Sequence, residues 1–203
     1  MTRIIGGHAG GRRLQTPKGD LTRPTADRVR EALFSSLEST LGSLSGLRVL
    51  DLYAGSGAVG LEAWSRGAAA VTLVERDRRT AATVRANAST LGCRVARVVT
   101  GSVRTVLVEG PADGGFDVVF ADPPYATTDD RVAGDLRALV EHGWLAPGAV
   151  VVVERPARGG PVTWPPGLAE DRVRTYGETA LASATAVEPD VPVPDTADVR
   201  EPA

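Results

Sequence analysis

A four-residue segment, Asp122-Pro123-Pro124-Tyr125, carries groups that could act on an amine. The exocyclic amine of a nucleobase is a weak nucleophile because its lone pair is delocalised into the ring. A carboxylate and a backbone carbonyl of the proline turn can accept both N–H bonds, which concentrates electron density on nitrogen and aims the lone pair at an electrophile. Proline has no competing N–H, and Tyr125 offers a face for base stacking. The alternative is a rigid turn that ends a strand, with Tyr125 covering the core.

A second motif lies at residues 48–63, RVLDLYAGSGAVGLEA. Its glycines, Gly55, Gly57 and Gly60, are spaced as G-x-G-x-x-G and are predicted to let a ligand approach the backbone closely. That spacing suits both dinucleotides and S-adenosylmethionine (SAM). Asp51 favours SAM, because a carboxylate four residues before the first glycine repels a pyrophosphate and attracts an ammonium and a sulfonium. An aspartate that only caps the turn is the structural alternative.

Further cofactor contacts are expected from the ends of later apolar segments. Glu75 ends the run 70–75, where an acid typically holds both hydroxyls of a ribose, in NAD and SAM sites alike. Ser102 follows the run 94–100, and its hydroxyl is expected to accept from the adenine amine. The expected cofactor set is completed by Tyr53, Ser56, Arg76 and Val103.

These residues require alternating strands and helices to position them. Strands are predicted around 49–52 and at 70–75, 94–100, 116–121 and 150–154, with a final hairpin of 172–176 and 179–185. Helices are predicted at 25–41, 61–66 and 78–91 and over a segment that ends near residue 143. The pattern predicts an α/β fold with a doubly wound, mostly parallel sheet. Because ligands bind where strand order reverses, Asp51 and Asp122 are expected to meet at one crevice.

Basic residues gather at the N-terminus although the net charge is −2. Residues 1–31 carry seven basic and three acidic side chains (+4), whereas residues 188–203 carry one and five (−4). The segment 3–15 predicts a hairpin that presents Arg12 and Arg13, followed by a helix capped by Thr25 with Arg28 and Arg30 away from its apolar stripe. This arrangement predicts a surface that follows phosphates. A flexible basic tail with ordinary surface arginines is the alternative.

Composition sets the class of protein. With 203 residues and 42% hydrophobic content, we expect one main domain at residues 46–187, a basic extension at 1–45 and a disordered acidic tail at 188–203. Cys93 is the single cysteine, which excludes an intrachain disulfide and fits a reducing cytoplasm. No apolar run is long enough to span a bilayer, so a soluble protein is expected. The two histidines suggest no metal site.

Several of these segments together resemble one family. RIIGG, the glycine and arginine run before Leu14, RPT with DRVREALF, VLDLYAGSGAVGLEA, FDVVFADPPY and YGET are similar to the RsmD family of bacterial 16S ribosomal RNA guanine-N2 methyltransferases, over about residues 3–185. The resemblance implies a seven-stranded SAM-dependent methyltransferase fold and, as target, the N2 amine of one guanine in the small ribosomal subunit or its assembly intermediate. It also implies a cytoplasmic monomer that acts at no membrane. The acidic tail lies outside the family pattern.

The resemblance assigns roles residue by residue. SAM would be bound by Asp51, Gly55, Gly57 and Glu75, the guanine amine by Asp122 to Tyr125, and RNA by Arg12, Arg13, Arg23, Thr25 and Arg28. Three other functions stay open. A DNA amine methyltransferase uses the same motif but usually needs a larger target-recognition region. An NAD-dependent dehydrogenase is disfavoured by Asp51 and by the lack of residues suited to hydride transfer. A non-catalytic RNA-binding protein could retain the fold.

Overall fold

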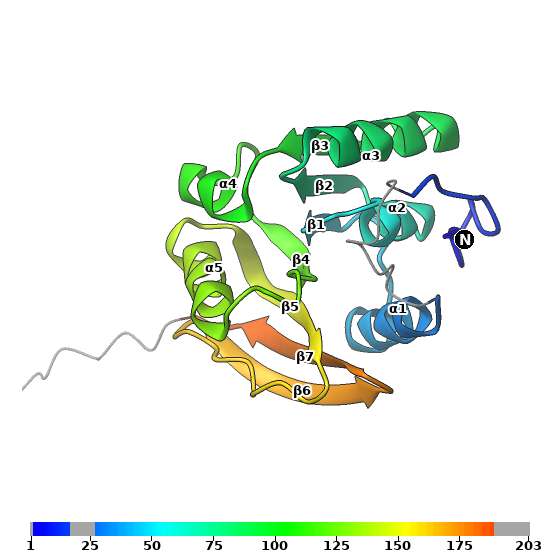
Figure 1. The fold of residues 1–203 in the computed structure, drawn as a ribbon. Coiled ribbons are helices and arrows are strands. Elements are labelled where there is room, and N and C mark those ends of the chain that lie inside the picture. The colour runs from blue at the N-terminus through cyan, green and yellow to red at the C-terminus, as the bar shows by residue number, and fades with distance from the viewer. Residues whose placement is uncertain (1, 17–26, 189–203) are drawn as a thin grey trace, which may run out of the picture.

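A single seven-stranded sheet lies at the centre of the computed structural model, which describes residues 2–16 and 27–188 (Figure 1). The strand order is β3-β2-β1-β4-β5-β7-β6, and β7 runs in the direction opposite to that of the other six strands of this sheet. The strands are β1 (Arg48–Leu52), β2 (Ala70–Glu75), β3 (Ala96–Thr100), β4 (Phe116–Ala121), β5 (Leu145–Pro156), β6 (Leu168–Tyr176) and β7 (Thr179–Ala186). The predicted doubly wound, mostly parallel sheet is confirmed.

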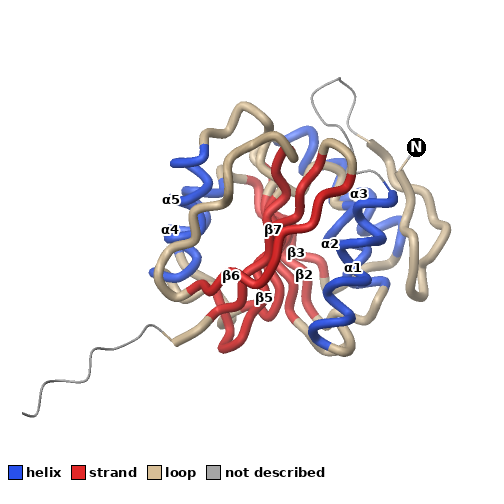
Figure 2. The backbone as a smooth tube through the Cα atoms, turned by 90° about the horizontal axis from the view of Figure 1, so that it is seen from below, coloured by secondary structure: helices blue, strands red, loops and turns tan. Residues whose placement is uncertain are grey.

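Helices cover both faces of this sheet. The helices are α1 (Asp27–Leu41), α2 (Ala58–Ser65), α3 (Arg78–Leu91), α4 (Val103–Glu109) and α5 (Asp129–Glu141). Figure 2 shows α1, α2 and α3 on one face and α4 and α5 on the other. Alternate strand residues therefore enter different cores: Val49 packs in the cluster with α1, and Leu50 packs in the cluster with α4 and α5. Burial on both faces explains why the parallel strands read as nearly continuous apolar runs. None of the helices in the described ranges is long and apolar enough to cross a membrane.

The helix α4 was not expected from the sequence. Its seven residues, VRTVLVE, are rich in β-branched side chains and disfavour a helix locally. Ser102 nevertheless caps it, because the Ser102 hydroxyl accepts a hydrogen bond from the Thr105 amide at 3.2 Å. The chain must also cross from β3 at one edge to β4 beside β1, and a covering helix buries the face it crosses. Tertiary packing thus overrides local propensity here.

The terminal hairpin returns the chain to the carboxyl edge of the sheet, which is the edge where the parallel strands end. In this antiparallel pairing Thr179 lies opposite Pro156 at the end of β5 and opposite Tyr176 at the end of β6. Gly177 makes the turn with φ of 62°, a left-handed conformation that favours glycine. The Ala157 amide donates to the Glu178 carbonyl at 2.8 Å. The tip of the predicted hairpin is therefore held beside the end of β5.

The N-terminal arm, residues 2–16, folds back on itself and docks on α2 and α3. The Ile4 amide donates to the Arg12 carbonyl at 2.9 Å, and Arg3 and Arg13 form an antiparallel bridge, which confirms the predicted hairpin. Its apolar side chains pack with Leu61 of α2 and Cys93 after α3 in a separate cluster. The arm is thus ordered by packing.

One prediction about α1 is wrong. Arg30 was expected on the exposed side of the helix with Arg28, but its side chain is fully buried. Its guanidinium donates to the Arg3 carbonyl and to Asp27 and lies 3.9 Å from the buried carboxylate of Glu62 on α2. A long side chain just beside the apolar stripe can reach a buried acceptor on the next helix, which helical periodicity does not reveal. Arg30 therefore joins the arm to the helices.

Candidate functional site

Strand register brings the predicted functional residues to one edge. Leu52 of β1 pairs with Val74 of β2 on one side and with Ala121 of β4 on the other. Glu75 follows Val74 on β2, and Asp122 follows Ala121 on β4. These two residues consequently lie on either side of the chain that leaves β1. The predicted meeting of strands one and four is thus observed.

The glycine loop after β1 is held by backbone and carboxylate contacts. The Ala54 amide donates to the Val74 carbonyl at 2.9 Å, and the Gly55 amide donates to Glu75 Oε2 at 3.1 Å. Glu75 Oε1 accepts from the Asp77 amide at 2.8 Å. Glu75 therefore holds the glycine loop through its own two hydrogen bonds. The remaining lone pairs of its carboxylate oxygens are the acceptors that a ribose could use.

Only one of the three glycines fits the predicted close approach to a ligand. A Cβ on Gly55 would meet only the Tyr53 carbonyl at 3.9 Å, and the φ of Gly55 is 56°. A Cβ on Gly57 would lie 2.9 Å from Val84, and one on Gly60 would lie 2.8 Å from Leu73. Gly57 and Gly60 are therefore required by packing of α2 against the protein interior. The prediction that Gly60 clears space for a ligand is wrong.

Asp51 is more deeply buried than a simple ligand contact would be. Its side chain is 2% exposed, and Oδ2 accepts a hydrogen bond from the Gly60 amide at 2.8 Å. Burial raises the pKa of Asp51 to about 7; the Gly60 bond opposes this shift, and the negative charges of Asp122 and Glu75 add to it. Asp51 thus caps the turn and also belongs to a group of three mutually repelling carboxylates.

The three carboxylates of Asp51, Glu75 and Asp122 fit a ligand that carries positive charge. Among the described residues, no basic side chain forms an ion pair with Asp51 or Glu75. An ammonium and a sulfonium would relieve the repulsion, whereas a pyrophosphate would increase it. The open backbone at Gly55 lies at the same place. These carboxylates and the open backbone therefore fit SAM better than a dinucleotide.

The residues of the Asp122 to Tyr125 turn differ in exposure. Asp122 is half-buried, Pro123 is buried and Tyr125 is 62% exposed. The exposed ring argues against Tyr125 as a cover for the core. The Pro124 carbonyl accepts from the Thr127 amide at 2.7 Å, which tightens the turn and leaves the Pro123 carbonyl as the better candidate acceptor for a substrate amine.

Two polar residues near this turn, Arg155 and Asp135, were not predicted from the sequence. Arg155 Nη2 donates to the Thr127 carbonyl at 3.2 Å and to Asp129 Oδ1 at 2.6 Å, so it ties the turn to α5 and β5. The Tyr53 hydroxyl donates to Asp135 of α5. A small cavity that Pro123 helps to line lies beside this pair. In the sequence, Glu154 and Arg155 directly follow the apolar run of β5. Their position at a strand end could have identified Arg155 as a site residue.

Tyr53 has an unusual backbone and an engaged hydroxyl. It has φ of 63°, a left-handed conformation that is uncommon outside glycine. Burial raises its pKa, and the bond to the Asp135 carboxylate raises it further, while burial also raises the pKa of Asp135. The ring packs on the side of α4 and α5. Its predicted cofactor contact stays a prediction.

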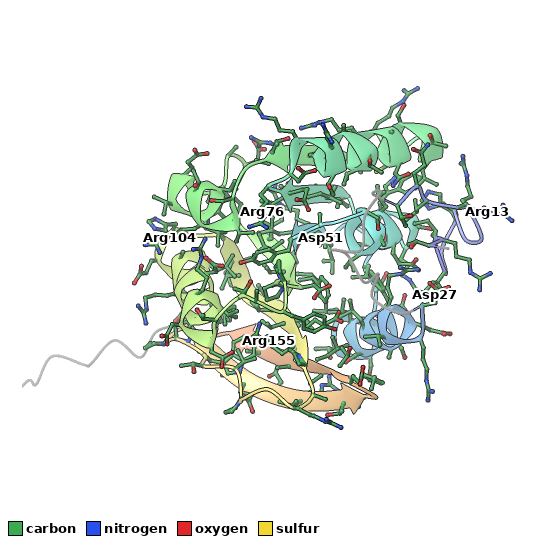
Figure 3. All side chains as sticks on the ribbon, in the orientation of Figure 1. Arg13, Asp27, Asp51, Arg76, Arg104 and Arg155 are labelled. Atoms are coloured by element: carbon green, nitrogen blue, oxygen red, sulfur yellow. The ribbon has the colours of Figure 1, made fainter. Side chains whose placement is uncertain are left out.

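The other cofactor candidates differ in exposure. Val103 is buried in the core with α4, Ser102 caps that helix, and Arg76 is exposed directly after Glu75. The Ser56 carbonyl accepts from Asn87 Nδ2 at 2.9 Å. Figure 3 labels Asp51 and, among others, three arginines, Arg76, Arg104 and Arg155, that come from elements around the same edge. The adenine contact of Ser102 stays a prediction.

The RNA candidates also differ from one another. Arg12 donates to the Thr90 carbonyl at 2.6 Å and the Leu91 carbonyl at 3.4 Å, so it fixes the arm to the end of α3. Arg13 and Arg28 are exposed. Arg23 and Thr25 lie outside the described residues.

Most of the chain is similar in sequence and in fold to known proteins. The family model described as conserved hypothetical protein 95 matches residues 2–185. Ribosomal RNA small subunit methyltransferase D of Escherichia coli K12 is 38% identical over 178 residues, which cover 88% of this chain and 86% of that protein. The protein of the same name from Haemophilus influenzae is 39% identical over 154 residues, covering 75% and 77%. The solved structure of the E. coli protein yhhF matches with a TM-score of 0.78 and 35% identity, covering 91% and 97%.

Proposed function

The chain belongs to the family described as conserved hypothetical protein 95, and from this membership we propose that it methylates ribosomal RNA of the small subunit. The donor is SAM, and the acceptor is the exocyclic N2 amine of one guanine in 16S ribosomal RNA, within the small subunit or an assembly intermediate. Support comes from the names of the relatives and from the fit of the site to a cationic cofactor.

The observation that carries the proposal is the position of Asp122. Its carboxylate lies at the end of β4, close enough to Asp51 for its charge to raise the Asp51 pKa, and it leads into a rigid turn with an exposed aromatic ring. This position supports a role for Asp122 as the hydrogen-bond acceptor for the guanine amine, beside the residues proposed to bind the cofactor. Bound SAM supplies a methyl group on a sulfonium.

The residues of the chain have separate tasks in this mechanism. Glu75 and the Gly55 backbone hold the cofactor, and Asp51 keeps the glycine loop in place while its negative charge faces the cationic part of the cofactor. Asp122 and the Pro123 carbonyl accept the two N–H bonds of the guanine amine and orient its lone pair. Tyr125 stacks on the base, a contact worth about 1 to 3 kcal/mol. Arg155 keeps the turn in position.

Methyl transfer to isolated small subunits tests the proposal. Subunits from a bacterial strain that lacks the corresponding methyltransferase would be incubated with the protein and radiolabelled SAM, and the modified nucleotide mapped. We expect one guanine methylated at N2. Transfer to DNA under the same conditions, or SAM binding without transfer to any ribosomal RNA, would contradict the proposal.

A further inference from the structure

A basic groove lies between α1 and the terminal hairpin and has no part in the site described above. Its walls carry Ser36 of α1, Arg172, Arg174 and Tyr176 of β6, and Ser183 of β7, and its floor is formed by apolar core side chains. Arg172, Arg174 and Tyr176 alternate along the strand and so face the same side. We call this feature the hairpin groove.

One end of the hairpin groove, at Tyr176, lies at the carboxyl edge of the sheet, the edge on which β4 ends before Asp122. The helix α1 leads into the start of β1, so its own first residues lie toward the carboxyl edge. The strand β6 runs in the same direction as β5, because both pair antiparallel with β7. Tyr176 is therefore at the carboxyl edge, beside the end of β5. Arg172 lies farther from that edge, where its Nη2 donates to Thr40 Oγ1 near the end of α1 at 2.7 Å.

The chemistry of the hairpin groove favours phosphate. Within residues 2–16 and 27–188, no acidic side chain lines the hairpin groove, and neither Arg172 nor Arg174 forms an ion pair. Arg174 is exposed and Arg172 is half-buried. Planar guanidinium groups match phosphate oxygens in fork geometry. Two residues apart on a strand, their backbones are separated by about 6.8 Å, which lets them contact neighbouring phosphates of one strand.

We propose that the hairpin groove binds the backbone of the single-stranded RNA that flanks the target nucleotide. Arg172 and Arg174 each contact a phosphate. Tyr176 lies where the RNA passes from the Asp122 site into the hairpin groove. This inference rests on the proposed function, because it takes the nucleotide at Asp122 to belong to RNA. It adds a second RNA contact on the same face of the sheet as the arm but beside β6 and β7, whereas the arm docks on α2 and α3.

The test compares the parent with the double variant Arg172→Gln/Arg174→Gln, which removes both positive charges and leaves polar side chains that can still donate hydrogen bonds. Binding of a small-subunit RNA fragment is measured at several KCl concentrations. Each lost contact to a single strand lowers the salt slope by about 0.7, so two contacts correspond to roughly 25-fold weaker binding at 0.1 M salt and little change at 1 M. The SAM dissociation constant should stay unchanged, and the KM for small subunits should rise.

A matched control removes the same charge elsewhere. Arg97 lies on the opposite edge strand and Arg137 on the face covered by α5, and both are exposed. Arg97→Gln/Arg137→Gln should bind RNA within about two-fold of the parent. Equal loss in both double variants, or no loss in the groove variant, would overturn the inference.

A charge reversal at Arg174 separates a loss of RNA binding from a loss of stability. Arg174→Glu should melt like the parent and weaken RNA binding more than Arg174→Gln does; equal binding by these two single variants would overturn the inference. Failure of the proposed function would look different, because the parent itself would then transfer no methyl group to ribosomal RNA. The comparison of RNA binding would still decide about the hairpin groove.

Discussion

Asp122 is the side chain on which methyl transfer depends in the proposed mechanism. Asp122→Ala should lower kcat at least about 100-fold, because alignment and electron donation felt in the transition state are commonly worth several kcal/mol. The SAM dissociation constant, measured by calorimetry, should stay nearly unchanged, since Glu75 and the glycine loop remain. A variant that melts and binds SAM like the parent yet methylates at a similar rate would remove Asp122 from the mechanism.

Asp51 should make SAM binding depend on pH. Its pKa of about 7 in the folded protein lies above the ordinary value of 3.8, so the folded state holds a proton that the unfolded state has lost. The contribution of Asp51 to folding stability therefore falls as pH rises from about 4 to 7 and then stays constant. The cationic cofactor favours the ionised carboxylate. Affinity for SAM should accordingly fall roughly 10-fold from pH 8 to pH 6, with proton release on binding at pH 6.

Asp51→Asn provides the control for this pH dependence. The amide oxygen can still accept the Gly60 hydrogen bond, but the side chain no longer titrates. Calorimetry at pH 6 and pH 8, in buffers with different ionisation enthalpies, should show little proton release for the variant. The same pH dependence in parent and variant would assign the titration to another group.

The packing of helix α2 on β2 depends on Gly60. The sequence pattern had predicted that this glycine lets a ligand approach the backbone. Gly60→Ala would place a Cβ 2.8 Å from Leu73 and 2.9 Å from Val71 in β2. Overpacking of this kind costs about 1 to 3 kcal/mol of stability. In urea unfolding we expect a lower midpoint, while SAM affinity of the folded fraction stays close to that of the parent. A stable variant that had lost SAM binding would restore the ligand interpretation of Gly60.

The N-terminal arm is attached to α2 through the buried carboxylate of Glu62. Glu62 accepts from the Ile5 amide at 2.6 Å and the Gly6 amide at 2.8 Å, and its Oε1 lies 3.0 Å from Arg66 Nε. It also faces the buried Arg30. Removing one partner of a buried ion pair leaves an uncompensated charge and typically costs about 3 to 5 kcal/mol.

Glu62→Ala should therefore lower the free energy of unfolding by several kcal/mol and speed amide exchange in residues 4–9. Exchange measured by mass spectrometry separates the two effects, because a general loss of stability exposes all amides and release of the arm exposes this segment first. Glu38→Ala is the matched control, since Glu38 is partly exposed and pairs only with Arg66 among the described residues. Unchanged exchange in the arm of the Glu62 variant would contradict the attachment.

At the scale of the whole molecule, the acidic end of the chain should be dispensable. Residues 189–203 lie outside the described residues, and the family match ends at residue 185. Their composition is acidic and proline-rich with few apolar positions. Truncation after Val187 should leave the melting temperature and methyl transfer near those of the full chain. A large loss of either would indicate that the tail contributes contacts.

The sequence determined the order of the elements apart from α4, and it determined the positions of the main functional motifs. Acidic residues at or near the ends of apolar runs, Asp51, Glu75 and Asp122, identified the strand ends, and the parallel topology then required them to meet at one edge. Periodicity also located α1, α3 and the terminal hairpin. These features depend on local patterns, which a single chain displays directly.

Only the tertiary structure decided which side chains are buried and what they contact. The helix α4 forms because the crossover needs a cover, against the propensity of its residues. Arg30 lies inside because Glu62 on another helix accepts its charge. Gly57 and Gly60 are glycines because α3 and β2 approach them, and Arg155 joins the site because β5 ends beside the turn. Each of these outcomes depends on a partner distant in sequence, and for that physical reason local pattern could not reveal it.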